Sequence, residues 1–191
     1  MVTIGCHPVV ASYSLPAALK SLSRTAPDYR IDLKHDLSRS VLLEIQQGRV
    51  DIGLVVNATP TPDLIVRKIA SDDVCVWTSP RASVSSQTSA KHDRIFCDPS
   101  LMQTQSILRK WKKAPTVQIA TSSLELIVRL TAEGLGYGIL PARAVKLVGA
   151  KLQVEPHLPS YRDTISLVYR PEFGKNKIER RVIEALTASL E

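Results

Sequence analysis

Residues 50–56 read Val50-Asp51-Ile52-Gly53-Leu54-Val55-Val56, and they are almost entirely apolar. Such a run is typical of a parallel strand that helices cover on both faces. A helical pattern with Val41 and Ile45 on one face precedes it, from Ser38 to Gly48. Gly48 is a natural residue just past a helix end, because glycine adopts a left-handed backbone at little cost. A helix that leads into a buried strand predicts an α/β fold.

The same alternation extends towards the N-terminus. Residues 2–5 form a short apolar segment that predicts a strand, and leucines at spacings of four and three predict an amphipathic helix over residues 14–26. Residues 31–34 alternate apolar and polar side chains, which indicates another strand, and Ser38 follows at a position where an N-cap is expected. The N-terminal part of the chain therefore predicts the order β-α-β-α-β.

A second series of strands and helices follows towards the C-terminus. Residues 64–69 and 74–77 predict two strands, and the serine-rich residues 79–93 predict a loop at which the chain crosses to a second lobe. The remaining expected elements are strands at 95–97, 116–119, 137–140, 152–154 and 164–169 and helices at 101–111, 122–133 and 175–190, with a short helical piece after Pro141. Two α/β lobes joined by crossing strands are the simplest arrangement, with a ligand cleft between them.

Composition restricts the class of protein. With 44% hydrophobic residues in 191, the chain can bury a core, and its apolar runs are too short to cross a bilayer. The N-terminus lacks a secretory signal pattern, so a cytoplasmic location and no membrane partner are expected. Three cysteines without a Cys-x-x-Cys spacing argue against a disulfide framework and a zinc site, and neither a metal nor a cofactor is expected.

The net charge of +7 raises the question of nucleic-acid binding. The dense cluster of cations consists of Arg109, Lys110, Lys112 and Lys113, beside Trp111. Either a solvated helix face or a contact with a nucleic-acid groove explains such a cluster, and the solvated face is favoured.

Three segments resemble the effector-binding domain of LysR-type transcription regulators. They are Leu15-Pro16 through Ala26-Pro27, Leu43 through Leu54 (LEIQQGRVDIGL), and Glu133 through Pro141 (EGLGYGILP). The glycines of the last segment do not match a dinucleotide-binding fingerprint, because they follow a helix and precede a strand. The resemblance spans essentially the whole chain.

This resemblance implies a periplasmic-binding-protein type 2 fold of two Rossmann-like lobes, with lobe I over about residues 1–78 and 165–191 and lobe II over about residues 82–160. It implies a bacterial transcription factor, not an enzyme, that binds a small effector such as a carboxylate and self-associates to a dimer or tetramer. Contact with DNA is expected only through an N-terminal winged helix-turn-helix, which this chain lacks. The alternative is a periplasmic-type solute-binding protein that has lost its signal peptide.

The resemblance and the expected helix starts together suggest effector-binding residues. Helix N-termini favour anions, so the expected contacts are Cys6-His7-Pro8, Ser38-Arg39 and Thr121-Ser122-Ser123, with Tyr137 as a neighbour and Ser100 as a further candidate. Simpler roles stay open, since Ser38 and Ser122 are also plausible N-caps, His7 a plain loop residue and Arg39 a solvated cation. A histidine at position 7 would add a pH-dependent charge if its pKa were near neutral.

Redox sensing and catalysis are the remaining alternatives. Thiol-switching members of the family pair two cysteines within the second lobe, whereas here Cys97 is expected there, and Cys6 and Cys75 in the first, so a disulfide switch is not expected. The four histidines are scattered, and no catalytic motif such as His-Glu-x-x-His or Gly-x-Ser-x-Gly occurs.

Overall fold

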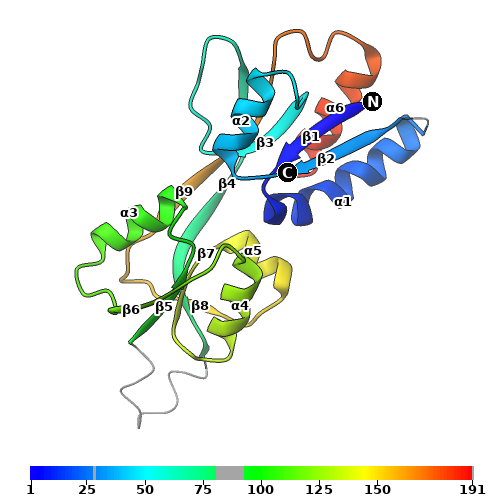
Figure 1. The fold of residues 1–191 in the computed structure, drawn as a ribbon. Coiled ribbons are helices and arrows are strands. Elements are labelled where there is room, and N and C mark those ends of the chain that lie inside the picture. The colour runs from blue at the N-terminus through cyan, green and yellow to red at the C-terminus, as the bar shows by residue number, and fades with distance from the viewer. Residues whose placement is uncertain (28, 81–92, 191) are drawn as a thin grey trace. The chain divides into compact units, whose positions relative to one another are not determined.

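The computed structural model describes residues 1–27, 29–80 and 93–190 (Figure 1). The chain divides into two compact units, which we name unit 1 (Met1–Ser71 with Thr164–Glu191) and unit 2 (Asp72–Asp163). The boundaries fall inside two strands, so each of these strands contributes to both units. Residues 81–92, which include most of the expected serine-rich loop and His92, lie outside the described residues.

Unit 1 has the β-α-β-α-β order that the sequence predicts, with a further strand and helix from the C-terminal part of the chain. Its sheet has the order β2-β1-β3-β9, in which β1 is parallel to β2 and β3, and β9 is antiparallel to β3. The elements are β1 (Val2–Cys6), α1 (Pro8–Thr25), β2 (Ile31–His35), α2 (Ser38–Gln46), β3 (Ile52–Val56), β9 (Tyr161–Tyr169) and α6 (Lys177–Ala188).

Helices cover both faces of this sheet. On one face, α1 and α6 pack over the buried side chains of β1 and β3, with Leu15 and Leu186 in the same cluster as Ile4. On the other face, α2 contributes Val41 and Ile45 to a second cluster. The continuous apolar character of residues 50–56 is thereby explained, because these side chains face a helix on either side.

Glycines allow α2 to approach the sheet closely. Gly5 and Gly53 are paired neighbours on β1 and β3. A Cβ atom at Gly53 would lie 2.9 Å from the side chains of both Val41 and Ile45, and one at Gly5 would lie 2.8 Å from Val41. Atoms at these distances overlap, so larger residues here would push α2 off the sheet.

The turn between α2 and β3 is held by side chains as well as by glycine. Gly48 has a φ of 73°, in the left-handed region where glycine carries no steric penalty. The Arg170 guanidinium donates to the backbone carbonyls of Ile45 and Val50, and the Asp51 carboxylate accepts a hydrogen bond of 2.8 Å from the Thr3 backbone N–H. These hydrogen bonds hold the segment around Gly48 in one conformation and thereby fix where β3 begins.

Unit 2 repeats the pattern with the remaining strands of the sheet. The strand order is β4-β7-β5-β6, with β8 paired to β4; β5 is parallel to β6 and β7, and β4 is antiparallel to β7. The elements are β4 (Ile65–Thr78), β5 (Arg94–Cys97), α3 (Met102–Lys110), β6 (Val117–Ala120), α4 (Leu124–Ala132), β7 (Tyr137–Pro141), α5 (Ala142–Val148) and β8 (Gln153–Val154).

The prediction of two separate strands at 64–69 and 74–77 was wrong, because β4 runs without a break from Ile65 to Thr78. The intervening Ser71-Asp72-Asp73 has the composition of a turn, yet it is extended. Asp72 is buried in the strand, and its carboxylate accepts from the Arg143 backbone N–H at the start of α5. Burial raises the pKa of the Asp72 carboxyl, and the bond to Arg143 partly offsets that rise.

The sheet of unit 2 is also covered on both faces. One face carries Val76, Ile95, Cys97 and Ile139, against Ile107 of α3. The other face carries α4, and Gly138 lies beneath it, because a Cβ atom there would collide with the Thr131 hydroxyl. None of the helices in the described part of the chain is long and apolar enough to cross a membrane.

Candidate functional site

In unit 1 the candidate residues lie where β1 ends and α1 begins. Cys6 is the last residue of β1 and is fully buried. His7 is the N-cap of α1, and its Nδ1 atom accepts a hydrogen bond of 3.3 Å from the Val9 backbone N–H. The helix begins at Pro8, before the predicted start at residue 14. The missed cue is Pro8 itself, since proline is favoured in the first turn of a helix.

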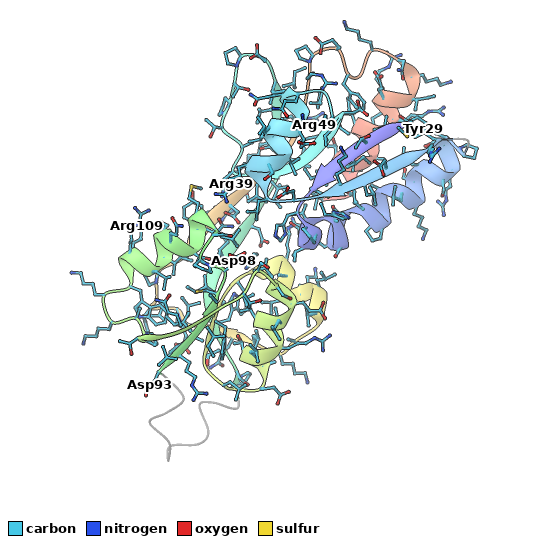
Figure 2. The ribbon with its side chains drawn as sticks, viewed as in Figure 1. Tyr29, Arg39, Arg49, Asp93, Asp98 and Arg109 are labelled. Carbon is cyan, nitrogen blue, oxygen red and sulfur yellow. The ribbon has the colours of Figure 1, made fainter. Side chains whose placement is uncertain are left out.

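The second group of unit 1 lies at the start of α2. The N-cap is Leu37, which makes no side-chain capping bond, so the N-cap role considered for Ser38 was wrong. Instead, the Ser38 hydroxyl oxygen accepts a hydrogen bond of 2.9 Å from the Val56 backbone N–H at the end of β3. Because the oxygen serves as the acceptor, the hydroxyl hydrogen can point to another group. Arg39 is exposed at the same helix start (Figure 2).

In unit 2 the residues after β6 form a hydroxyl-rich helix start. Thr121 is tied to the neighbouring strand by a hydrogen bond of 3.0 Å from its backbone N–H to the Cys97 carbonyl. Its hydroxyl accepts from the Ser123 backbone N–H at 3.2 Å, and the Ser123 hydroxyl caps α4 by accepting from the Leu126 N–H at 3.2 Å. Ser123 rather than Ser122 is therefore the N-cap, and Ser122 is exposed.

The turn after β5 carries an acid that the sequence reasoning missed. Asp98 is only 3% exposed, and its Oδ1 atom accepts from the backbone N–H and the hydroxyl of Ser100, at 2.9 and 2.6 Å. Its Oδ2 atom is buried and has no partner among the described residues. Figure 2 shows Asp98 at one end of β5 and Asp93 at the other. The available cue is an Asp-Pro-Ser sequence directly after an apolar strand.

Tyr137 lies at the other edge of the same sheet. It is the first residue of β7 and pairs with Ile95, near the beginning of the parallel strand β5. Its ring packs edge-on against Trp111, with ring centroids 5.4 Å apart. Burial, and then the negative charge of Glu155, raise the pKa of the Tyr137 phenol. The structure thus brings Ser100 and Thr121 to one edge of the sheet and leaves Tyr137 at the opposite edge.

The cysteines are poorly suited to redox chemistry. Burial raises the pKa of Cys6 to about 12, and burial together with the charge of Asp98 raises the pKa of Cys97. Cys75 belongs to unit 2 with Cys97, so its predicted place in the first lobe was wrong. Strand β7 separates the strands of these two cysteines. Trp77 and Phe96 are both paired with Gly138, so their side chains lie on the same face of the sheet. Cys75, two residues before Trp77, shares that face, whereas Cys97, next to Phe96, lies on the other face, so the two thiols cannot form a disulfide without backbone movement.

Metal binding has no support in the described residues, among which no group of three or more histidine, cysteine, aspartate and glutamate side chains is placed to hold an ion. What the two units offer instead is helix starts at the carboxyl ends of parallel strands, where ligands of α/β proteins commonly bind.

Comparison with protein families gives a match that covers the chain. The family described as LysR substrate binding domain matches residues 1–191. The chain is 24% identical to a hydrogen peroxide-inducible genes activator of Haemophilus influenzae, over 93% of this chain and 63% of the relative. It is also 24% identical to a probable hydrogen peroxide-inducible genes activator of Mycobacterium leprae, over 96% of this chain and 63% of that relative. The chain thus spans less than two thirds of the length of either curated relative.

Solved structures agree on the fold. The reduced form of the OxyR regulatory domain from Pseudomonas aeruginosa has a TM-score of 0.72 and 19% identity, covering 99% of this chain and 96% of that one. Full-length LysG from Corynebacterium glutamicum, with bound effector Arg, has a TM-score of 0.78 and 14% identity, covering 99% of this chain and 67% of that one. The predicted fold class, a periplasmic-binding-protein type 2 fold, is confirmed.

Proposed function

Because this chain belongs to the LysR substrate binding domain family, we propose that it is the effector-sensing part of a bacterial transcription regulator that recognises a small organic anion. The family is one of transcription regulators rather than enzymes. In our proposal the full-length protein binds DNA through a separate N-terminal domain in the cytoplasm, and the effector biases it towards one of two states. This assignment leaves the solute-receptor alternative without support.

The proposal that the effector is an anion rests on the chemistry of the helix starts. Helices α1, α2 and α4 each follow a strand after a loop of one to three residues, and the first turns of α1 and α2 contain no acidic residue. Free backbone N–H groups and the helix dipole favour a negative group there. The hydroxyls of Ser38 and Thr121 and the guanidinium of Arg39 add hydrogen-bond donors of matching polarity. The location of the effector between the lobes stays a prediction.

Peroxide sensing through a thiol is a second candidate, because both curated relatives are named for hydrogen peroxide. The reactive species would be a thiolate. The raised pKa values of Cys6 and Cys97 and the geometry of Cys75 and Cys97 support the effector function over this one. Intact-mass spectrometry after stoichiometric peroxide is expected to show unchanged protein, and rapid formation of a disulfide would reverse the preference.

Thermal-shift screening with small aliphatic and aromatic carboxylates tests the proposal. A ligand at 100 times its dissociation constant stabilises the folded state by about 2.7 kcal/mol. The double variant Ser38→Ala with Thr121→Ala should weaken a hit about tenfold, because each hydroxyl contributes roughly 0.5–1.5 kcal/mol. The matched control is Ser21→Ala with Thr116→Ala, which removes the same groups at exposed positions away from the helix starts. Equal weakening in both variants, or no weakening in either, would remove the site assignment.

We also propose self-association of the chain, to a dimer or tetramer. The strands at the two ends of the strand order have exposed apolar side chains: β2 leaves Leu33 38% exposed, and β6 leaves Val117 and Ile119 46% and 42% exposed. Apolar side chains on open strand edges favour pairing with another chain. Sedimentation at tens of micromolar is expected to show an oligomer that Leu33→Lys with Ile119→Lys dissociates, and a wild-type monomer would contradict this.

A further inference from the structure

We propose that Asp98 is a binding residue for a positively charged group of the effector, so that the effector is a zwitterion with an ammonium group beside its carboxylate. This inference rests on the proposed function and specifies its ligand class. The structure supplies a buried acid at the strand end where that function places the ligand.

The two oxygens of the Asp98 carboxylate are used differently. Oδ1 accepts both hydrogen bonds from Ser100, at 2.9 and 2.6 Å, and these bonds hold the turn between β5 and α3. Oδ2 is buried in a residue that is 3% exposed, and none of the described residues donates to it. A buried acceptor without a donor is costly to stability, and such groups in native proteins call for an explanation.

The fold itself does not require an acid at this position. An asparagine side chain has one carbonyl oxygen with two lone pairs, which is enough to accept both bonds from Ser100. The second carboxylate oxygen and its share of the negative charge are therefore surplus to the turn. Ionised acceptors form their strongest hydrogen bonds with ionised donors, which favours an ammonium or guanidinium group as the partner of Oδ2.

The position of Asp98 fits a ligand contact. It follows β5 at the carboxyl end of a parallel strand pair, and the adjoining residue Cys97 accepts the Thr121 N–H that begins the loop to α4. A negative group of the effector at the start of α4 and a positive group at Asp98 would thus be bound by neighbouring loops of one unit. The simplest molecule with both groups is an amino acid.

Isothermal titration calorimetry on pairs of compounds that differ only in the amino group tests this proposal. The probes are L-glutamate with glutarate, L-phenylalanine with 3-phenylpropanoate, and L-norleucine with hexanoate. Wild-type protein should bind the amino member of at least one pair roughly 10- to 100-fold more tightly, since hydrogen bonds to charged groups contribute about 1.5–3 kcal/mol. Asp98→Asn should reduce this preference to less than about threefold.

Asp93→Asn is the matched control. It makes the same change at an exposed carboxylate directly before β5, whereas Asp98 directly follows that strand (Figure 2). This variant should keep the preference for the amino member. Without ligand, Asp98→Asn should melt at the wild-type temperature or above it, because the two bonds from Ser100 remain and a buried charge is removed.

The outcomes separate this inference from the proposed function. Equal binding of both members of a pair by wild-type protein overturns the ammonium assignment and leaves the anion site standing. An unchanged preference in Asp98→Asn likewise overturns the assignment to Asp98. A lower melting temperature of ligand-free Asp98→Asn, with its preference retained, makes Asp98 a purely structural residue. Failure of carboxylates and amino acids alike to bind contradicts both proposals.

Discussion

In unit 1, α2 lies close against β1 and β3 over Gly5 and Gly53, and in unit 2, α4 lies close against β7 over Gly138. The starts of these two helices differ. Helix α2 has no side-chain cap and no acid in its first turn, whereas α4 has the Ser123 cap and Glu125 in its first turn. Unit 2 also has a buried acid at position 98, after a neighbouring strand. The shared glycines set the distance of each helix from its strands, whereas the loops at the helix starts differ in charge and capping, and it is on these loops that our two binding proposals rest.

The largest effect should come from breaking the shared feature. Gly138→Ala places a methyl group against the Thr131 hydroxyl, so α4 must shift from the sheet, and we expect a loss of about 3 kcal/mol in the free energy of unfolding. Urea denaturation measures this loss. Adding Thr131→Ala should recover part of it by removing the colliding oxygen.

Gly149→Ala is the control for that variant. No atom lies within 4 Å of a Cβ there, although the φ of 71° strains an alanine. It should lose about 1 kcal/mol. Equal losses in Gly138→Ala and Gly149→Ala would mean that close approach of α4 is not what glycine provides.

A second feature of unit 1 is the turn before β3, which the side chain of Arg170 holds in place. Arg170→Ala removes donors to two carbonyls of that turn, and we expect a loss of about 2 kcal/mol because bonds to a charged donor are strong. Arg49→Ala removes an exposed arginine on the same turn that pairs with Glu44, and it should change unfolding little. Urea denaturation of both variants checks the order, and an Arg49→Ala loss as large as that of Arg170→Ala would contradict it.

The sequence predicts the alternating order of strands and helices well, because continuous apolar strands such as residues 50–56 and amphipathic helices have distinct patterns. It does worse where tertiary contacts override local cues. Ser71-Asp72-Asp73 has a turn composition, but Asp72 is stabilised in a strand by the distant Arg143 backbone. Ser38 resembles an N-cap, but its hydroxyl bonds to Val56, whose proximity only the sheet creates.

The candidate site shows the same limit. Loops after strands could be anticipated, and Ser100 and Thr121 do lie at one edge of the unit 2 sheet. Tyr137 lies at the opposite edge, because it is the first residue of β7, which is parallel to β5. Asp98 was missed because its importance comes from burial, which a lone aspartate in a turn-like sequence does not reveal.

Cys6 allows a pH test within unit 1. Its pKa of about 12 in the folded protein exceeds the ordinary value of 9.0, so the unfolded chain loses this proton first as the pH rises. The contribution of the protonated Cys6 thiol to the free energy of unfolding is fully present below pH 9.0. It is lost as the pH rises towards about 12, at about 1.4 kcal/mol per pH unit. Urea denaturation between pH 8 and 10.5 should show this decline in wild type and a smaller decline in Cys6→Ala. Equal slopes in the two proteins would mean that burial does not hold the Cys6 thiol in its protonated form.

The smallest effect concerns the start of α4, where two adjacent serines differ in role. Ser123→Ala removes the hydroxyl that accepts from the Leu126 N–H, and it should cost about 1 kcal/mol, the usual value of an N-cap. Ser122→Ala changes an exposed side chain that makes no cap, and it should stay within about 0.5 kcal/mol of wild type. Thermal unfolding of the two variants without ligand gives the comparison. If Ser122→Ala were the more damaging change, Ser122 rather than Ser123 would be the N-cap, and α4 would begin one residue earlier.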